Sequence, residues 1–558
     1  MASRRNNNHP SQDLGDYVMR GGERIELERE SDRFTAMPAD ARELERLRSA
    51  PGVRAVEPVT REVYRVLTTM NERDAAMSAL RSDAFNTIAH HAYRPKDGEG
   101  TVFYITDRIV MRLAKSATQA DMSVLLDKYK LRLLKAYERR PQTYLVQVTK
   151  DSGANPIKIA NLLAREKGLV EYAEPDMINR FYSSQIPSDP LFKRQWHLDA
   201  KAGPQLLAAA AVGAPAAWDI TPGERSIVVA VIDDGFDLSH PDFQGAGKVV
   251  HPRDYVDGDS TPFPEASHDD YHGTPCAGVA IAESNGRGVV GVAMGCAFMP
   301  VRFPLSASDD ELVQIFEETA AHADVISCSW GPPPVNAPLP QVLSDTFTEL
   351  ATSGGPRGNG VVICFAAANF NAPLNADVGF AGFVWRDYDG QLRRTRGRIL
   401  NGNATHPSLI AVAASTSLNR HAAYSNWGKE VCVCAPSNNF NPLDSSAFAP
   451  GLGIWTTDNE RHGQDFTPRS RYTGRFGGTS SATPLVAGIA ALVLSANPNL
   501  SAAEVKEILQ STADKIVDTD PDFLGAMRGA YDGNGHSDWF GFGKVNAEKA
   551  VREAKRRG

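Results

Sequence analysis

The sequence predicts an α/β protein in which a large C-terminal domain, built on a mostly parallel sheet, follows small α+β units. After about residue 190, continuous apolar runs such as "SIVVAVID", "DVISCSW" and "GVVICFAAA" alternate with helical stretches such as "SDDELVQIFEETAAHA". Runs of this kind are typical of parallel strands that helices cover on both faces. In such a sheet, functional residues are expected at the carboxyl ends of the strands.

The N-terminal part contains a repeated order of elements. Residues 1–16 are polar and are expected to form a disordered tail. Strand-like "RIELERESDRFTAM", helical "ADARELERLRSA" and extended "GVRAVEPVTREVYRVL" lie within residues 17–95. A similar order returns over 99–182, from "TVFYITDRIVMRLA" to "LVEYAEPDMINRFY". We therefore predict two related α+β units in tandem. The linker-like "SSQIPSDP" then opens a domain over 183–558.

Composition narrows the class of protein. The chain has 558 residues, of which 42% are hydrophobic and 23% are charged, an ordinary composition for a globular protein. Its net charge of -8 weighs against nucleic acid as a partner. The N-terminus "MASRRNNNHPSQDLGDY" lacks the apolar core of a secretory signal, and no run of about 18 apolar residues predicts a membrane span. We expect a cytoplasmic protein with reduced core cysteines, while export by another route stays open.

Four polar residues stand at the ends of apolar segments of the large domain. Asp233 ends the strand run "IVVAVIDDG", and Asn369 ends "VVICFAAAN". His272 and Ser480 open helical stretches, in "YHGTPCAGVAIA" and "GGTSSATPLVAGIAALVLS". Taken singly, each has a plain structural explanation as a turn residue or a helix cap.

Taken together, these residues form a set with one chemical use. A serine is a poor nucleophile until a histidine removes its proton, and the histidine needs a carboxylate to fix its tautomer. The oxyanion then needs preorganised donors. Pro484 is expected in the first turn of a helix, which would place Ser480 among the free N–H groups of the helix N-terminus. The chain order Asp, His, Ser is that of subtilisin.

In these residues the sequence resembles the subtilisin-like serine proteases, or subtilases. Five blocks match in order: "VAVIDDGFDLSHPDF", "HGTPCAGVAIAESNGRGVVGVA", "DVISCSWGP", "FAAAN" and "GGTSSATPLVAGIAALV". The match extends from about Ser183 to the C-terminus. It implies a three-layer, subtilisin-like domain with Asp233, His272 and Ser480 as a catalytic triad. It also implies Asn369 as the oxyanion donor, beside the main-chain N–H of Ser480.

"SCSWGP" and "HGTPCAG" are most similar to the kexin-like branch, which cuts after basic residues. That branch has acidic residues after "SWGP" and an Asp near the position of Asn401, whereas this chain has "PPVNAP" and an amide. An acidic specificity pocket is therefore not evident. Ser329, Trp330 and Gly331 are still expected to line the groove where substrate pairs as an added strand. Ala368 stands where the family usually has Gly.

The same resemblance implies a structural calcium ion. Asp189, Asp242 and Asn285 match ligands of the family's strong site, together with main-chain carbonyls of the 283–290 loop. Hard oxygen ligands suit Ca²⁺. The plain alternative is that Asp242 only caps a turn in "HPDF".

The segment "LVEYAEPDMINRFY" resembles the end of a subtilase propeptide, which inhibits the enzyme and assists its folding. That similarity gives residues 99–182 the role of an inhibitory propeptide and puts self-cleavage after Tyr182, with Arg180 as the rival site. Residues 17–95 exceed what a simple propeptide needs. A second inhibitory layer, a partner-binding module and a structural spacer all stay open for them.

The sequence thus predicts a serine endopeptidase for protein or peptide substrates, made as a zymogen that its own propeptide inhibits. Two other functions stay open. A transpeptidase or ligase on the same fold would pass the acyl group to an amine rather than to water. A non-catalytic peptide-binding protein would leave the four residues idle, and their joint presence weighs against it.

Overall fold

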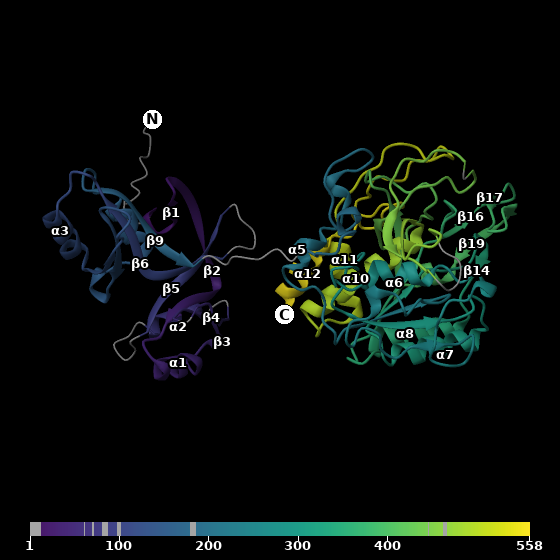
Figure 1. Ribbon diagram of the computed structural model, residues 1–558, viewed down its shortest axis with the longest axis horizontal. Helices are drawn as coiled ribbons and strands as arrows, with labels where there is room; N and C mark the ends of the chain where they lie inside the picture. Colours follow the sequence, from purple (N-terminus) through teal and green to yellow (C-terminus); the bar gives the residue numbers. More distant parts are fainter. Residues whose placement is uncertain are drawn as a thin grey trace, which may run out of the picture. The chain divides into compact units, whose positions relative to one another are not determined.

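The computed structural model describes residues 13–60, 62–69, 72–80, 87–96, 102–178, 186–444, 446–460 and 466–558. The chain divides into two compact units, Met1–Phe181 and Tyr182–Gly558 (Figure 1). The predicted cleavage site at Tyr182, like its rival Arg180, lies outside the described residues.

The first half of the N-terminal unit is a five-stranded sheet with two helices. Its elements are β1 (Tyr17–Arg20), β2 (Glu23–Met37), α1 (Ala41–Arg48), β3 (Val53–Pro58), β4 (Tyr64–Thr68), α2 (Arg73–Leu80) and β5 (Ile88–Pro95). The strand order is β1-β2-β4-β3, and β5 pairs with β2. Helix α1 begins where the Asp40 side chain accepts the N–H groups of Arg42 and Glu43.

The second half is a four-stranded sheet with two helices. Its elements are β6 (Tyr104–Leu113), α3 (Gln119–Tyr129), β7 (Leu131–Ala136), β8 (Thr143–Val148), α4 (Pro156–Leu163) and β9 (Val170–Ile178), with strand order β7-β8-β6-β9. If β1 is set aside, both halves follow the order βαββαβ, and the first strand of that order (β2 or β6) pairs with the last and the third. The repeated order in the sequence thus corresponds to a repeated topology.

The C-terminal unit contains a seven-stranded parallel sheet with strand order β11-β12-β10-β13-β15-β20-β21. The strands are β10 (Val228–Asp233), β11 (Arg253–Asp254), β12 (Ala297–Arg302), β13 (Val325–Cys328), β15 (Val362–Ala366), β20 (Ile410–Ser415) and β21 (Val433–Pro436). The expected α/β fold class is confirmed. Apart from the edge strand β11, the strands are short, mostly apolar runs, as strands buried on both faces require.

Helices cover both faces of this sheet, which gives three layers (Figure 1). The core on one face is built from α5 (Ala214–Trp218), α6 (Gly273–Ile281), α10 (Thr479–Ala496), α11 (Ala502–Ser511) and α12 (Ala547–Arg557). On the other face α7 (Asp309–Ala320) and α8 (Gln341–Ser353) pack on the sheet. All six cysteines carry free, buried thiols, as expected.

Smaller sheets decorate the C-terminal unit. Strands β14 (Asn336–Ala337), β19 (Arg398–Asn401) and β16 (Asn375–Asp377) form one, next to the short helix α9 (Gly402–Thr405). Strands β17 (Phe383–Arg386) and β18 (Leu392–Thr395) form an antiparallel hairpin, as do β22 (Ile454–Thr457) and β23 (Tyr472–Phe476).

Within the described residues, α10 is the one helix long and apolar enough to cross a membrane, with a mean hydropathy of 1.5 over 18 residues. Because 89% of this stretch is buried inside the unit, α10 is accounted for as a core helix.

Candidate active site

Asp233 and His272 form a hydrogen-bonded pair. Asp233 is the last residue of β10, and His272 directly precedes α6. Nδ1 of His272 lies 2.9 Å from Oδ1 and 3.1 Å from Oδ2 of Asp233, which has no exposed surface. Burial opposes the charged imidazole, but the Asp233 carboxylate outweighs it and raises the pKa of His272 well above its usual value. The contact makes Nδ1 the donor and leaves Nε2 for proton transfer.

Ser480 lies beside this pair, in the first turn of α10. Its side chain is 7% exposed, and Oγ donates to the main-chain oxygen of Ser329 at 3.4 Å. Among the residues that the structure describes, no hydrogen bond joins Ser480 Oγ to His272. The two residues share one neighbour, because Cys276 Sγ lies 3.6 Å from His272 Nδ1 and 3.5 Å from the carbonyl oxygen of Ser480.

Pro484 explains this contact and corrects one expectation. Helix α10 begins at Thr479, so Pro484 stands in its second turn rather than its first. A proline has no N–H, so the carbonyl oxygen of Ser480, four residues earlier, loses its helical donor. That oxygen accepts instead from Ser329 Oγ at 3.1 Å and from Cys276 Sγ. The proline is tolerated inside the helix because side chains from other elements replace the missing donor.

Asn369 is attached to the start of the same helix. Its Oδ1 accepts from the N–H of Thr479 at 2.8 Å and from Thr479 Oγ1 at 2.9 Å, which turns the amide NH₂ away from Thr479. The preceding residue, Ala368, has a φ of 78°. Glycine adopts this left-handed conformation freely, but alanine does so under strain.

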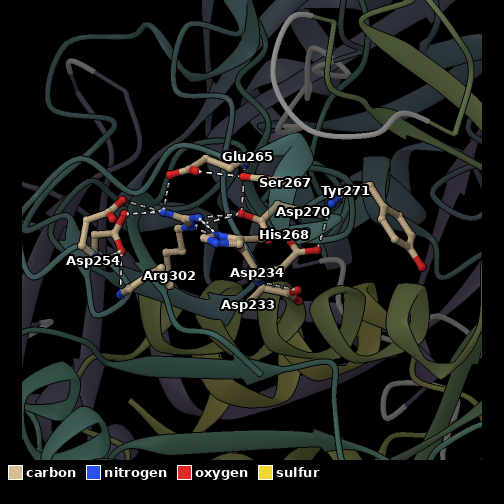
Figure 2. Close-up of polar contacts among 12 residues, drawn as sticks. Asp233, Asp234, Asp254, Glu265, Ser267, His268, Asp270, Tyr271 and Arg302 are labelled. Atoms are coloured by element: carbon tan, nitrogen blue, oxygen red, sulfur yellow. Dashed lines mark hydrogen bonds and ion pairs between the residues drawn. The ribbon is translucent and has the colours of Figure 1, made fainter. Parts of the chain in front are cut away.

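Asp234, which sequence reasoning did not single out as a site residue, fixes the chain at His272 (Figure 2). Its buried carboxylate accepts the main-chain N–H groups of Tyr271 and His272 at 2.9 Å and of Gly273 at 2.7 Å. Burial, and then the adjacent Asp233 carboxylate, raise the pKa of Asp234. The acidic doublet was the signal in the sequence, since one carboxylate binds the imidazole and the next binds the start of its helix.

Arg302 is the hub of the polar contacts in Figure 2, and it was also missed. It ends β12, in register with Asp233 on the neighbouring strand. Its guanidinium is 1% exposed and donates to Asp270 Oδ2 at 2.8 Å, Asp254 Oδ2 at 3.0 Å and the carbonyl oxygen of Asp234 at 3.1 Å. Its further partners are Asp257, Glu265 and His268. An arginine that ends an apolar strand gave no sign of this role.

Of the predicted groove residues, Ser329 contacts Ser480 directly. Both Ser329 Oγ and the Ser329 carbonyl contact Ser480, as described above, and Trp330 Nε1 donates to the carbonyl oxygen of Ile232 at 2.8 Å. A Cβ on Gly331 would lie 3.6 Å from Nδ2 of Asn401, so these residues are neighbours. Asn401 is 5% exposed, and its Oδ1 accepts the N–H of Ala404. An uncharged amide, rather than a carboxylate, therefore lies beside Gly331.

The structure also brings together the three side chains of the expected calcium site. The N–H of Asn285 donates to Asp189 Oδ1 at 3.0 Å, and Asn285 Nδ2 lies 3.3 Å from Asp242 Oδ1. Both carboxylates are buried, and Asp242 also accepts from the N–H of Val289 and the hydroxyl of Tyr472, which are uncharged. Burial raises the pKa of Asp242 to about 7, and Asp189 adds to the rise. Two buried carboxylates with uncharged donors fit a cation that prefers oxygen ligands.

Comparisons with known proteins show which family the sequence matches. A profile of the Subtilase family matches residues 224–543. A calcium-dependent protease of a Nostoc species is 34% identical over 503 residues, which cover 86% of this chain and 68% of the relative. Thermitase of Thermoactinomyces vulgaris is 29% identical over 66% of this chain and 99% of its own length. Kexin of Saccharomyces cerevisiae is 28% identical over 66% of this chain and 40% of its own length.

Among solved structures, the Aeromonas sobria serine protease in complex with its chaperone has a TM-score of 0.52 at 21% identity, covering 66% of this chain and 67% of that one. This likeness supports the fold of the C-terminal unit. The family profile spans more than half of the sequence, and the Nostoc relative aligns through both units. The chain therefore belongs to the subtilase family of serine proteases.

Proposed function

We propose that this subtilase is a serine endopeptidase whose residues 99–182 act as an inhibitory propeptide. Asp233, His272 and Ser480 are its catalytic triad, and Asn369 supplies an oxyanion donor. Ser329, Trp330 and Gly331 bind the substrate main chain. The observation that carries this proposal is the buried Asp233–His272 hydrogen bond beside a serine in the first turn of a buried helix.

Each residue has a definite part in the proposed reaction. Ser480 Oγ leaves the Ser329 carbonyl, gives its proton to Nε2 of His272 and attacks the carbonyl carbon of the scissile peptide bond. Asp233 holds the ring and stabilises the imidazolium that forms. The Asn369 NH₂ and the N–H of Ser480 donate to the oxyanion. His272 then passes the proton to the leaving amine. In the second step, His272 removes a proton from water, which attacks the carbonyl carbon of the acyl-enzyme and releases Ser480.

The zymogen part of the proposal concerns residues 17–182. The segment over 99–182 has the topology and the ending that suit a propeptide, and cleavage near Tyr182 would release it. The first half, over 17–95, repeats the topology and makes an additional inhibitory layer a testable role for it.

A calcium ion is the proposed structural cofactor, held by Asp189, Asp242 and Asn285. When bound, it supplies positive charge that offsets two buried carboxylates and fixes the 283–290 loop to the start of the domain. The name of the Nostoc relative, calcium-dependent protease, points the same way.

The test is covalent labelling with a fluorophosphonate probe, together with intact mass and N-terminal sequencing. We expect wild type to be labelled and to be cut near Tyr182, and Ser480→Ala to be neither labelled nor cut. Ser481→Ala is the matched control, since it removes the adjacent buried serine and should leave labelling intact. Wild type that resists the probe after its N-terminal unit has been removed by added protease would contradict the proposal.

A further inference from the structure

The hairpin β17–β18 is inserted between Asn369 and β20. Both of its strands are tied to the rest of the unit. The Arg386 guanidinium donates to the carbonyl oxygen of Leu443 at 2.7 and 2.9 Å. Trp385 Nε1 donates to Thr395 Oγ1 at 3.0 Å, and Thr395 Oγ1 donates to the carbonyl oxygen of Pro334. The hairpin is therefore held at a fixed position on the unit.

An apolar cluster joins the hairpin to the active-site segment. Trp385 and Phe383 of β17 pack with Ala368 and Phe370, which flank Asn369 in sequence. The rings of Phe370 and Trp385 are 5.4 Å apart in an edge-to-face arrangement. The hairpin thus rests directly on the turn that presents the proposed oxyanion donor.

Tyr388 stands in the turn at the tip of this hairpin. The turn is closed by the N–H of Gly390, which donates to the carbonyl oxygen of Asp387 at 2.9 Å, and is braced by Arg393, which pairs with Asp387 and Asp389. The Tyr388 ring contacts Phe370 edge-on at 5.6 Å, yet 80% of the residue is exposed.

We propose that Tyr388 is a specificity-determining residue that contacts the substrate. Its ring forms a wall of the peptide-binding surface next to Asn369 and packs against an apolar substrate side chain close to the scissile bond. This inference rests on the proposed peptidase function. A large aromatic ring that is exposed, held in a rigid turn and adjacent to the reacting centre gains contact area at little entropic cost when an apolar side chain covers it.

The experiment is a cleavage profile on a mixed peptide library, read by mass spectrometry after the N-terminal unit has been removed. For Tyr388→Ala, we expect enrichment of apolar residues at one position flanking the cut to fall about fivefold, with KM rising more than kcat falls. Tyr388→Phe keeps the ring and should keep the preference. Phe380→Ala is the matched control, because Phe380 is 89% exposed in the same insertion but rests on Arg396 instead.

A second variant keeps the test decisive if removal of the ring alters folding. Tyr388→Glu places a charge at the same exposed point, and we expect the same flanking position to shift toward basic residues. Fluorophosphonate labelling separates the two levels of inference. Variants that are labelled at Ser480 but share the wild-type profile would overturn the role of Tyr388 and leave the peptidase intact. A wild type that is never labelled would overturn the proposed function itself.

Discussion

Arg302 Nη2 lies 2.8 Å from Asp270 Oδ2, two residues before His272, while Nε of the same guanidinium lies 3.1 Å from the carbonyl oxygen of Asp234, one residue after Asp233. A single buried cation therefore fixes the chain beside both members of the proposed acid–base pair. Main-chain geometry at His272 and Asp233 is coupled through it.

Replacement of Arg302 should reduce turnover as well as stability. For Arg302→Ala, buried Asp254 and Asp270 lose their countercharge, which costs about 3–5 kcal/mol. A displacement of His272 near 1 Å would lower kcat on the order of a hundredfold. Arg302→Lys should recover only part of both, because the compact ammonium lacks the planar five-donor fork with which the guanidinium reaches its separate partners.

The check combines kcat, KM and urea unfolding. Arg357→Ala is the control, since it breaks another pair with a buried carboxylate, at 2.7 Å to Asp324, and should destabilise the unit without changing kcat of the folded fraction. Equal losses of kcat in the two variants would contradict the positioning role of Arg302.

The acidic limb of the pH–activity profile should lie above 6.5. The pKa of His272 is raised by Asp233, and the base must be neutral to accept a proton from Ser480. Asp234 and Cys276 are the other titratable groups next to it. Measured kcat/KM should therefore rise as pH increases through that raised value, and a limb below 6.5 would be evidence against the pair.

The free energy of unfolding should also depend on the protonation of His272, but it should fall over the pH range in which activity rises. A raised folded pKa means that protonated His272 stabilises the folded state fully below its unfolded pKa and loses this contribution as pH rises through the folded value. In a Ser480→Ala background, which removes self-digestion, the free energy of unfolding should fall over that interval. Asp233→Asn should flatten the decline.

Removal of calcium should destabilise the C-terminal unit. If calcium is present at about 100 times its Kd, a chelator should lower the free energy of unfolding by about 2.7 kcal/mol. Asp242→Asn should abolish most of this response, because it removes one of two buried carboxylates. Asp345→Asn, on the exposed face of α8, should respond like wild type. A chelator effect that survives in Asp242→Asn would place the ion elsewhere.

Ala368→Gly should stabilise the protein. Alanine at a φ of 78° is strained, and relief of that strain exceeds the entropy that glycine adds to the unfolded chain, for a net gain of about 0.5–1 kcal/mol. Ala366→Gly, inside β15 and outside the left-handed region, should lose about the same amount. Chemical unfolding of both variants, again with Ser480→Ala, provides the comparison, and a loss in both would refute the strain.

The parallel sheet and the Asp233–His272 pair could be predicted from the sequence because strand ends are local features. The run "VAVID" indicates both a buried strand and its terminal carboxylate. Contacts between segments that are distant in the chain are harder to predict from the sequence. The sheet register sets Arg302 opposite Asp233, and Arg302 reaches Asp270 from there, which no local pattern encodes. Cys276 was within reach, since it lies four residues after His272 and so shares its helix face. Tyr388 gave no signal, because a tyrosine in a turn is ordinary until the hairpin has been placed on Phe370.

Pro484 has a consequence for how the nucleophile is carried. In an uninterrupted helix, the carbonyl oxygen of Ser480 would accept the N–H of the residue four positions later. The serine would then be attached to α10 alone and would move only with that helix. Because Pro484 has no N–H, that oxygen accepts hydrogen bonds from two other segments instead. One donor is Ser329, directly after strand β13, and the other is Cys276, on the helix that follows His272. Three segments far apart in the chain thus share one anchor point. We therefore expect the distances among the serine, its base and the substrate-binding strand to stay constant even when the C-terminal unit as a whole fluctuates.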